Sequence, residues 1–284
     1  MSPLLSLRPL LLVLALCACG PGLRSAARPY PAPTTAQVLG ALRSRAAGLL
    51  ALRAQARAEY LDNGQRVKIS FAALAARPER LRIAGESALT GPLLTLATDG
   101  RRFQLLDVQH DRFLEGDATP CNVARLIRVE LPPREVIEVL FGGVALLPEP
   151  TETTLVWDAK LGETLRLRDA QGRTEVIQIT LPPSGNPGDA PIEVRAAELY
   201  AGGADKDVLL WRVRHEDFAT YTLPGGTAKV RLPGVTYIED PPHHSDVKLR
   251  WRTQERELNP NLPPDSFQLQ SPPGIAREEA VCGG

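Results

Sequence analysis

Short apolar segments separated by turn residues occupy the stretch from Arg77 to Gly116. At its centre the Asp99-Gly100 pair lies between the apolar segments 94–96 and 103–105. Asp and Gly tolerate the positive φ of a primed two-residue turn, so this arrangement indicates a β-hairpin. The pattern predicts consecutive antiparallel strands, and we expect the rest of the chain to extend or cover the sheet that they form.

A helix and a strand are expected before this stretch. Thr34 or Thr35 is a candidate N-cap, and apolar side chains then recur at helical spacing. This apolar face consists of Val38, Leu39, Leu42, Ala46 and Leu49. From Leu50 to Tyr60 apolar and polar residues alternate, which predicts a half-buried strand, although the alanine-rich segment is also compatible with a longer helix.

A turn at 62–64 leads to a returning strand on which Val67, Ile69 and Phe71 continue the alternation. Between Cys121 and Gly143 the apolar residues instead recur at intervals of three and four, which predicts two short helices. Pro132-Pro133 separates them, because proline is tolerated at a helix start and damaging inside a helix.

Strands resume after this helical region. The expected segments are 155–157, 165–168, 176–181, 209–214, 230–232 and 247–252, each bounded by turn residues such as those at 169–172 and 202–207. Their spacing favours an antiparallel sheet wound in sequence. Arginine occupies alternate positions in several segments, which predicts a charged face whose arginines pair with glutamates across strands, or alternatively an anionic-ligand site.

The N-terminal residues are expected to direct export. One arginine, Arg8, precedes an apolar run over 9–18 that has the length of a signal-peptide core and is too short to span a bilayer. The run ends in Leu-Cys-Ala-Cys-Gly, which resembles a bacterial lipobox with Cys19 as the lipidated residue; ordinary secretion is the alternative. We therefore expect a lipoprotein signal peptide over 1–18, a lipidated N-terminus and proline-rich tether over 19–33, and a single domain over 34–284.

Composition and cysteine content narrow the possible functions. The 284 residues contain 33 Lys+Arg and 33 Asp+Glu, a balance that argues against nucleic acid as a partner. Once Cys17 is removed and Cys19 lipidated, two cysteines remain, Cys121 and Cys282, in a compartment that permits disulfides. We expect them to pair, with two free thiols as the alternative.

The sequence offers no residues for catalysis. The His243-His244 pair lies in a loop sequence without further His or Cys at ligand spacing, so no metal site is expected. There is no nucleophile elbow and no phosphate loop. We expect a non-enzymatic protein without a cofactor.

Several motifs, in this order, resemble the LolA/LolB superfamily of periplasmic lipoprotein carriers and receptors. They are Arg77-Pro78 followed by Leu81, Leu96 to Gly100 followed by Phe103, and Leu140 to Gly143 after the proline-separated helices. The resemblance extends over residues 39–147 and is closest to a divergent, lipid-anchored branch. It implies a mainly β, α+β fold: an open antiparallel half-barrel with an N-terminal helix and two short lid helices, which binds acyl chains without catalysing a reaction.

Combined with the strand pattern, this resemblance predicts an apolar cavity. The expected lining is Leu52, Val67, Ile69, Phe71, Leu81, Ile83, Leu94, Leu96, Phe103 and Leu105, with Val136, Ile137, Leu140 and Phe141 on the lid. The alternative is that all of these residues form a dry core. The resemblance makes Arg77 a lid latch, whereas its neighbours Arg80 and Arg82 favour an ordinary surface role.

These observations lead to a functional hypothesis. We expect a protein anchored by lipid to the bacterial outer membrane, facing the periplasm, which binds the acyl chains of lipoproteins or lipids as a carrier or receptor. A periplasmic carrier protein is a further partner that the hypothesis admits. The connection 85–92, where receptors carry a protruding loop, is short and offers only Leu89. An anchored structural or assembly lipoprotein is the main alternative, and a hydrolase comes last.

Overall fold

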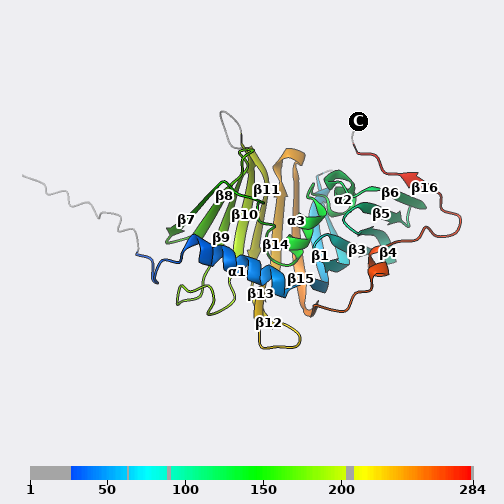
Figure 1. Cartoon of the computed structure of the whole chain (residues 1–284). Coiled ribbons are helices and arrows are strands. Elements are labelled where there is room, and N and C mark those ends of the chain that lie inside the picture. Colours follow the sequence, from blue (N-terminus) through cyan, green and yellow to red (C-terminus); the bar gives the residue numbers. More distant parts are fainter. Residues whose placement is uncertain (1–26, 63, 88–90, 203–207, 283–284) are drawn as a thin grey trace, which may run out of the picture.

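The computed structural model describes residues 27–62, 64–87, 91–202 and 208–282. One open sheet of 14 strands organises the chain, with β7 at one edge and β16 at the other (Figure 1). In order across the sheet, the strands are β16 (Arg277–Glu279), β6 (Arg112–Asp117), β5 (Arg102–Asp107), β4 (Gly91–Thr98), β3 (Arg80–Ser87), β2 (Gln65–Ala76), β1 (Ala51–Asp62), β15 (Ser245–Leu258), β14 (Val235–Asp240), β11 (Val208–Glu216), β10 (Glu193–Ala201), β9 (Thr174–Thr180), β8 (Gly162–Arg168) and β7 (Glu152–Asp158).

A separate two-stranded sheet pairs β12 (Ala219–Thr222) with β13 (Lys229–Leu232). The helices are α1 (Thr35–Gly48), α2 (Pro120–Ile127) and α3 (Pro133–Leu140), with short 3-10 turns η1 (Pro241–His243) and η2 (Pro264–Phe267). Thr34 caps α1 and forms a capping box with Gln37, as expected from its hydroxyl side chain. The predicted fold class, N-terminal helix and pair of short helices are confirmed.

The chain enters the large sheet twice. After β6 the chain passes through α2 and α3 and enters β7 at the opposite edge, then returns strand by strand until β15 pairs with β1. The prediction that the later strands form an antiparallel sheet wound in sequence is confirmed for β7 to β11, β14 and β15. Strands β10, β12, β14 and β16 were not predicted, and 230–232 belongs to the small sheet.

The face of the sheet that the helices cover is called the inner face here. Cross-strand pairing places Ala54, Ala73, Ile83, Leu96 and Leu105 next to one another on it. All five are buried in the main core, together with apolar residues of α1, α2 and α3. The alternation read from the sequence therefore identifies this face correctly, because successive residues of a strand point to opposite sides.

The opposite face is partly charged and partly covered. Arg212 contacts Glu198 at 2.6 Å and Glu239 at 3.2 Å from neighbouring strands, the cross-strand pairing that the sequence predicts. Near the other edge, the C-terminal segment packs over a small cluster in which Phe113 and Leu269 are buried. The segment ends in β16, which pairs with β6 in parallel.

A disulfide joins Cys121 at the start of α2 to Cys282, with the Cα atoms 6.0 Å apart. Asn122 reinforces this connection by donating to the carbonyl oxygens of Asp117 at 2.9 Å and Ala280 at 3.2 Å. The C-terminal segment is thus fixed to α2 by covalent and polar contacts.

Several predicted features lie outside the described residues: the signal peptide, Cys19, Asn63, Leu89 and 203–207. The end of the predicted tether is described and contacts the sheet. Arg28 bonds to the fully buried carboxylate of Glu163 at 2.9 Å, and Tyr30 packs against the core. Within the described residues, no helix has both the length and the apolar character needed to cross a bilayer.

Candidate functional site

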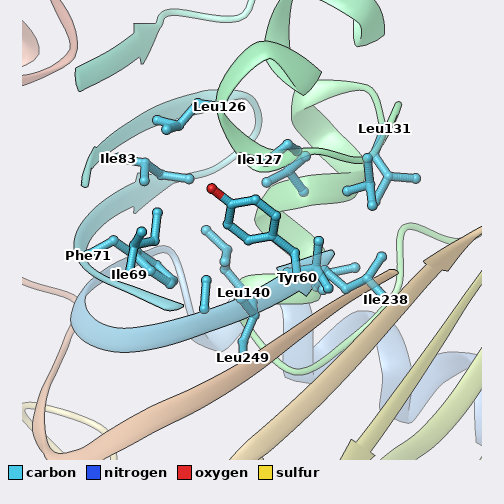
Figure 2. A pocket seen from close by; sticks show the side chains of 15 residues that line it. Tyr60, Ile69, Phe71, Ile83, Leu126, Ile127, Leu131, Leu140, Ile238 and Leu249 are labelled. Atoms are coloured by element: carbon cyan, nitrogen blue, oxygen red, sulfur yellow. The ribbon is translucent and has the colours of Figure 1, made fainter. Parts of the chain in front are cut away.

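An apolar cavity lies between the inner face and the two short helices. Its walls come from β1, β2, β3, β14 and β15, and its cover from α2, α3 and the linker between them (Figure 2). The lining residues are Ala58, Tyr60, Ile69, Phe71, Ile83, Leu126, Ile127, Val129, Leu131, Val136, Val139, Leu140, Ile238, Val247 and Leu249. Tyr60 is the sole member of this set with a polar side-chain atom.

The cavity is small in the state described. Its volume is about 50 Å³, whereas an engineered cavity of about 150 Å³ is needed to hold one benzene molecule. This volume is too small for an acyl chain while α2 and α3 keep their present positions. The contacts that hold α2 and α3 against the sheet therefore determine how much space the cavity offers.

Tyr60 projects into the middle of the cavity. Figure 2 shows its ring among Ile83, Ile127, Leu131 and Ile238, with the hydroxyl group directed toward Ile83 and Leu126. The centre of the ring lies 5.4 Å from the guanidinium carbon of Arg128 in the α2–α3 linker. A hydroxyl in an otherwise apolar site is the kind of polar group that orients a ligand.

The residues predicted from sequence divide into two groups. Ile69, Phe71, Ile83, Val136 and Leu140 line the cavity. The close-packed core instead contains Leu52, Leu81, Leu96, Phe103, Leu105, Ile137 and Phe141, while Val67 and Leu94 are half-buried outside the lining. These residues share the inner face, but helix side chains fill the space over them; α2, for example, packs on β4.

Sequence reasoning missed most of the remaining lining. Ala58 and Tyr60 lie on the predicted apolar face of β1, so the alternation was a usable signal for them. Ile238, Val247 and Leu249 come from strands about 180 residues further along the chain. They reach the site only because β15 pairs with β1, which local pattern does not reveal.

Arg77 joins the sheet to the end of α3. Its guanidinium donates to both carboxylate oxygens of Glu138, at 2.6 and 2.7 Å, and to the carbonyl oxygen of Ala46 in α1 at 2.8 Å. It also lies 4.4 Å from the centre of the Phe141 ring. The two charged side chains are 13% and 12% exposed, so solvent screens this pair weakly. Arg77 thus connects three elements through one side chain.

A second arginine holds the same helix end from α1. One terminal nitrogen of Arg45 donates to the carbonyl oxygens of Phe141 at 2.6 Å, Gly142 at 3.0 Å and Arg231 at 3.3 Å. Burial, followed by repulsion from Arg77, lowers the pKa of Arg45 to about 10. Sequence analysis did not single out Arg45, because an arginine on a helix is usually a surface residue.

The linker between α2 and α3 is fastened to the β14–β15 turn. The side chain of His243 lies 2.8 Å from Asp240 and 3.4 Å from Glu130, and the backbone N–H of Glu130 donates to Asp240 at 2.8 Å. Asp240, as hydrogen-bond acceptor and neighbouring charge, raises the pKa of His243. In the described part of the chain, no cluster of three His, Cys, Asp or Glu side chains has the arrangement of a metal site.

No protein-family model matches the sequence, and comparison with curated proteins gave no significant match. Solved structures do match. A LolA superfamily protein from Nitrosomonas europaea aligns over 82% of this chain and 98% of its own, with a TM-score of 0.50 and 12% identity. A domain named for outer membrane lipoprotein sorting, from Vibrio parahaemolyticus, aligns over 81% and 95%, with a TM-score of 0.52 and 10% identity.

A DUF1329 family protein from Desulfovibrio piger aligns over 84% of this chain and 98% of its own, with a TM-score of 0.53 and 11% identity. The common feature is the broad open sheet with its helical cover. The chain therefore has the fold of the LolA superfamily, and the predicted resemblance is confirmed at that level. Fold by itself does not define what the cavity binds.

Proposed function

We propose that this protein is a non-catalytic acyl-chain binding protein of the bacterial envelope, acting as a carrier or receptor for lipoproteins or lipids. The observation that carries the proposal is the apolar cavity beneath two short helices, where arginine side chains hold the end of α3 in addition to its core packing. An acyl chain replaces the contacts between helices and sheet when the cover moves away. Burial of each CH₂ group then contributes about 0.8 kcal/mol.

Arg77 is the lid latch in this proposal. Its bidentate pair with Glu138 is made only when α3 lies against the sheet, and its bond to Ala46 holds the same guanidinium to α1. The disulfide keeps α2 attached to the C-terminal segment, so we expect α3 and the linker to move further than α2. The order of events is release of the latch, displacement of α3, and entry of the chain beside Tyr60.

In this proposal, the cellular location of the protein is inferred from the N-terminal sequence. Lipidation of Cys19 anchors the protein, the outer membrane is its site, and the domain faces the periplasm, where a carrier protein delivers cargo. The names of two structurally similar proteins, which refer to the LolA superfamily and to outer membrane lipoprotein sorting, support an envelope role. Metabolic labelling with a clickable fatty acid tests the anchor: wild type should carry the label and Cys19→Ala should not.

A structural or assembly lipoprotein that uses this fold as a docking surface is the second candidate. The cavity volume of about 50 Å³ favours it, because a permanently filled core needs no ligand. The two functions differ in what happens when the cavity is blocked. Ala58 lines the cavity and Ala72, on the neighbouring strand, is exposed on the other face, so the same substitution at both positions provides a matched pair.

Native mass spectrometry of full-length protein taken from its own envelope provides the test. The carrier function predicts bound lipid or lipoprotein in wild type and Ala72→Phe, and its loss in Ala58→Phe. If wild type carries no lipid, or if Ala58→Phe retains as much as Ala72→Phe, acyl-chain binding in this cavity is refuted. Thermal melting of both variants confirms that each is folded.

A further inference from the structure

A second, polar pocket lies behind α3, on the side away from the apolar cavity. It has a volume of about 280 Å³ and is bounded by the second half of α1, by Arg134 and Glu138 of α3, and by the segment 143–150. This volume is just below the lower end of the range for drug-sized ligands, about 300 Å³. The pocket has room for a small polar group and lies apart from the space proposed for acyl chains.

Three arginines line this pocket: Arg43 and Arg45 from α1 and Arg134 from the first turn of α3. Among the described residues, none of the three forms an ion pair with a carboxylate. Arg43 and Arg134 are exposed, whereas the Nε atom of Arg45 is buried and has no hydrogen-bond partner. Helix α1 contains no acidic residue that would balance its charges.

The nearby carboxylates compensate only part of the charge of this cluster. Glu138 is already held by Arg77 through two hydrogen bonds, so two buried arginines share one carboxylate. Glu149 lines the pocket but is exposed. Behind it, burial raises the pKa of Glu135 to about 7 and that of Glu175 to about 8, which leaves Glu175 mostly uncharged at neutral pH.

The absence of a side chain at Gly143 completes the site. A Cβ atom at this position would lie 2.9 Å from the second terminal nitrogen of Arg45, closer than such contacts normally allow. Gly143 therefore permits the guanidinium to approach the wall of the pocket. This nitrogen is not the one that donates to Phe141 and Gly142, so it remains available to a ligand.

We propose that Arg43, Arg45 and Arg134 form a binding site for a phosphate group between α1 and α3. Planar guanidinium groups bind phosphate oxygens through paired hydrogen bonds, and a dianion or monoanion here balances the charge that Arg45 carries without a carboxylate of its own. The ligand is either free phosphate or the phosphate of a phospholipid headgroup. Occupation of the site links α1 to the start of α3, and it does not depend on acyl chains entering the apolar cavity.

Binding to the full-length protein in detergent tests this assignment with two probes. Inorganic phosphate is titrated by calorimetry, and the protein is separately mixed with sedimenting phosphatidylcholine vesicles with and without phosphatidylglycerol. The variants are Arg43→Gln and Arg134→Gln, both at exposed positions outside the latch. Arg57→Gln is the matched control, because Arg57 is exposed on the opposite face of β1 and lies far from the pocket lining.

We expect phosphate to bind to wild type and Arg57→Gln, with at least tenfold weaker binding in each pocket variant. Vesicle binding that follows the same order identifies the headgroup as the source, whereas phosphate binding without vesicle binding identifies free phosphate. The proposal is overturned if wild type binds neither probe, or if Arg57→Gln weakens binding as much as the pocket variants. Phosphate binding at the polar pocket does not require the apolar cavity, so we expect it to be the same in Ala58→Phe as in wild type. The phosphate site and acyl-chain binding can therefore be refuted separately.

Discussion

Removal of the Arg77 side chain tests the latch most directly. In Arg77→Met, Glu138 of α3 loses the two hydrogen bonds that Arg77 donates, and Ala46 of α1 loses a third, while an apolar side chain still lies beside Phe141. Breaking a buried ion pair by removing one partner costs about 3–5 kcal/mol. Arg45 remains beside Glu138 and compensates part of its charge, so we take the lower limit, about 3 kcal/mol.

This energy corresponds to a roughly hundredfold larger population of the open cover. Hydrogen exchange followed by mass spectrometry measures it, because amides of α3 exchange through local opening. We expect exchange in 133–140 to accelerate roughly a hundredfold, while exchange in β8 and β9 stays unchanged. Arg53→Met is the control: it breaks an Arg–Glu pair of the same 2.6 Å length in which both side chains are more than half exposed.

The affinity for acyl chains should rise as the population with an open cover rises. If only the open form binds, the apparent Kd for a fluorescent fatty acid is inversely proportional to the open fraction. The Kd therefore falls as the open fraction rises, until that fraction approaches one. Unchanged exchange in α3 of Arg77→Met would refute the latch. Faster exchange without tighter binding would retain the latch and refute acyl-chain entry at this site.

Three further outcomes follow from the structure. Cys282→Ser should lower the free energy of unfolding by about 2–5 kcal/mol, measured by denaturant titration against wild type with its disulfide intact. Glu175 keeps its proton in the folded state up to about pH 8 while the unfolded chain ionises near its ordinary pKa, so stability should fall as pH rises from 4.5 to 8. Glu175→Gln should reduce this slope in melts at pH 5 and 8.5, and the raised pKa of Glu135 accounts for part of the slope that remains. The pKa of His243 is also raised, and this group likewise lowers stability as pH rises, because His243 loses its positive charge and with it the link to Glu130. Amide exchange in the α2–α3 linker should therefore increase with pH above that pKa in wild type, and His243→Gln should abolish this increase.

Local sequence pattern was sufficient for most individual elements. The change from helical spacing to alternation near Leu50 identified both α1 and β1, and Pro132-Pro133 separated α2 from α3. Alternation also identified the inner face, because side-chain direction in a strand depends only on position parity. Strand β10 escaped detection because its alanines and half-buried residues give a weak alternation.

The cavity was less predictable than the face that contains it. Leu96 and Ile83 are cross-strand neighbours on the inner face, yet Ile83 lines the cavity and Leu96 is completely buried in the core. The difference arises from which side chains of α2 and α3 lie above each residue. That depends on helix placement, which contacts distant in sequence determine.

The sequence by itself determined the kinds of most elements, the apolar side of each strand and the two cysteines that form the disulfide, since these follow from local periodicity and side-chain chemistry. Tertiary structure alone decided that β7 lies at the far edge, that β15 pairs with β1, and that Arg45 joins Arg77 at the end of α3. The physical reason is that the free energy of burial favours covering any apolar face, whatever element covers it. Strand order and helix position depend instead on how all the covered faces pack together.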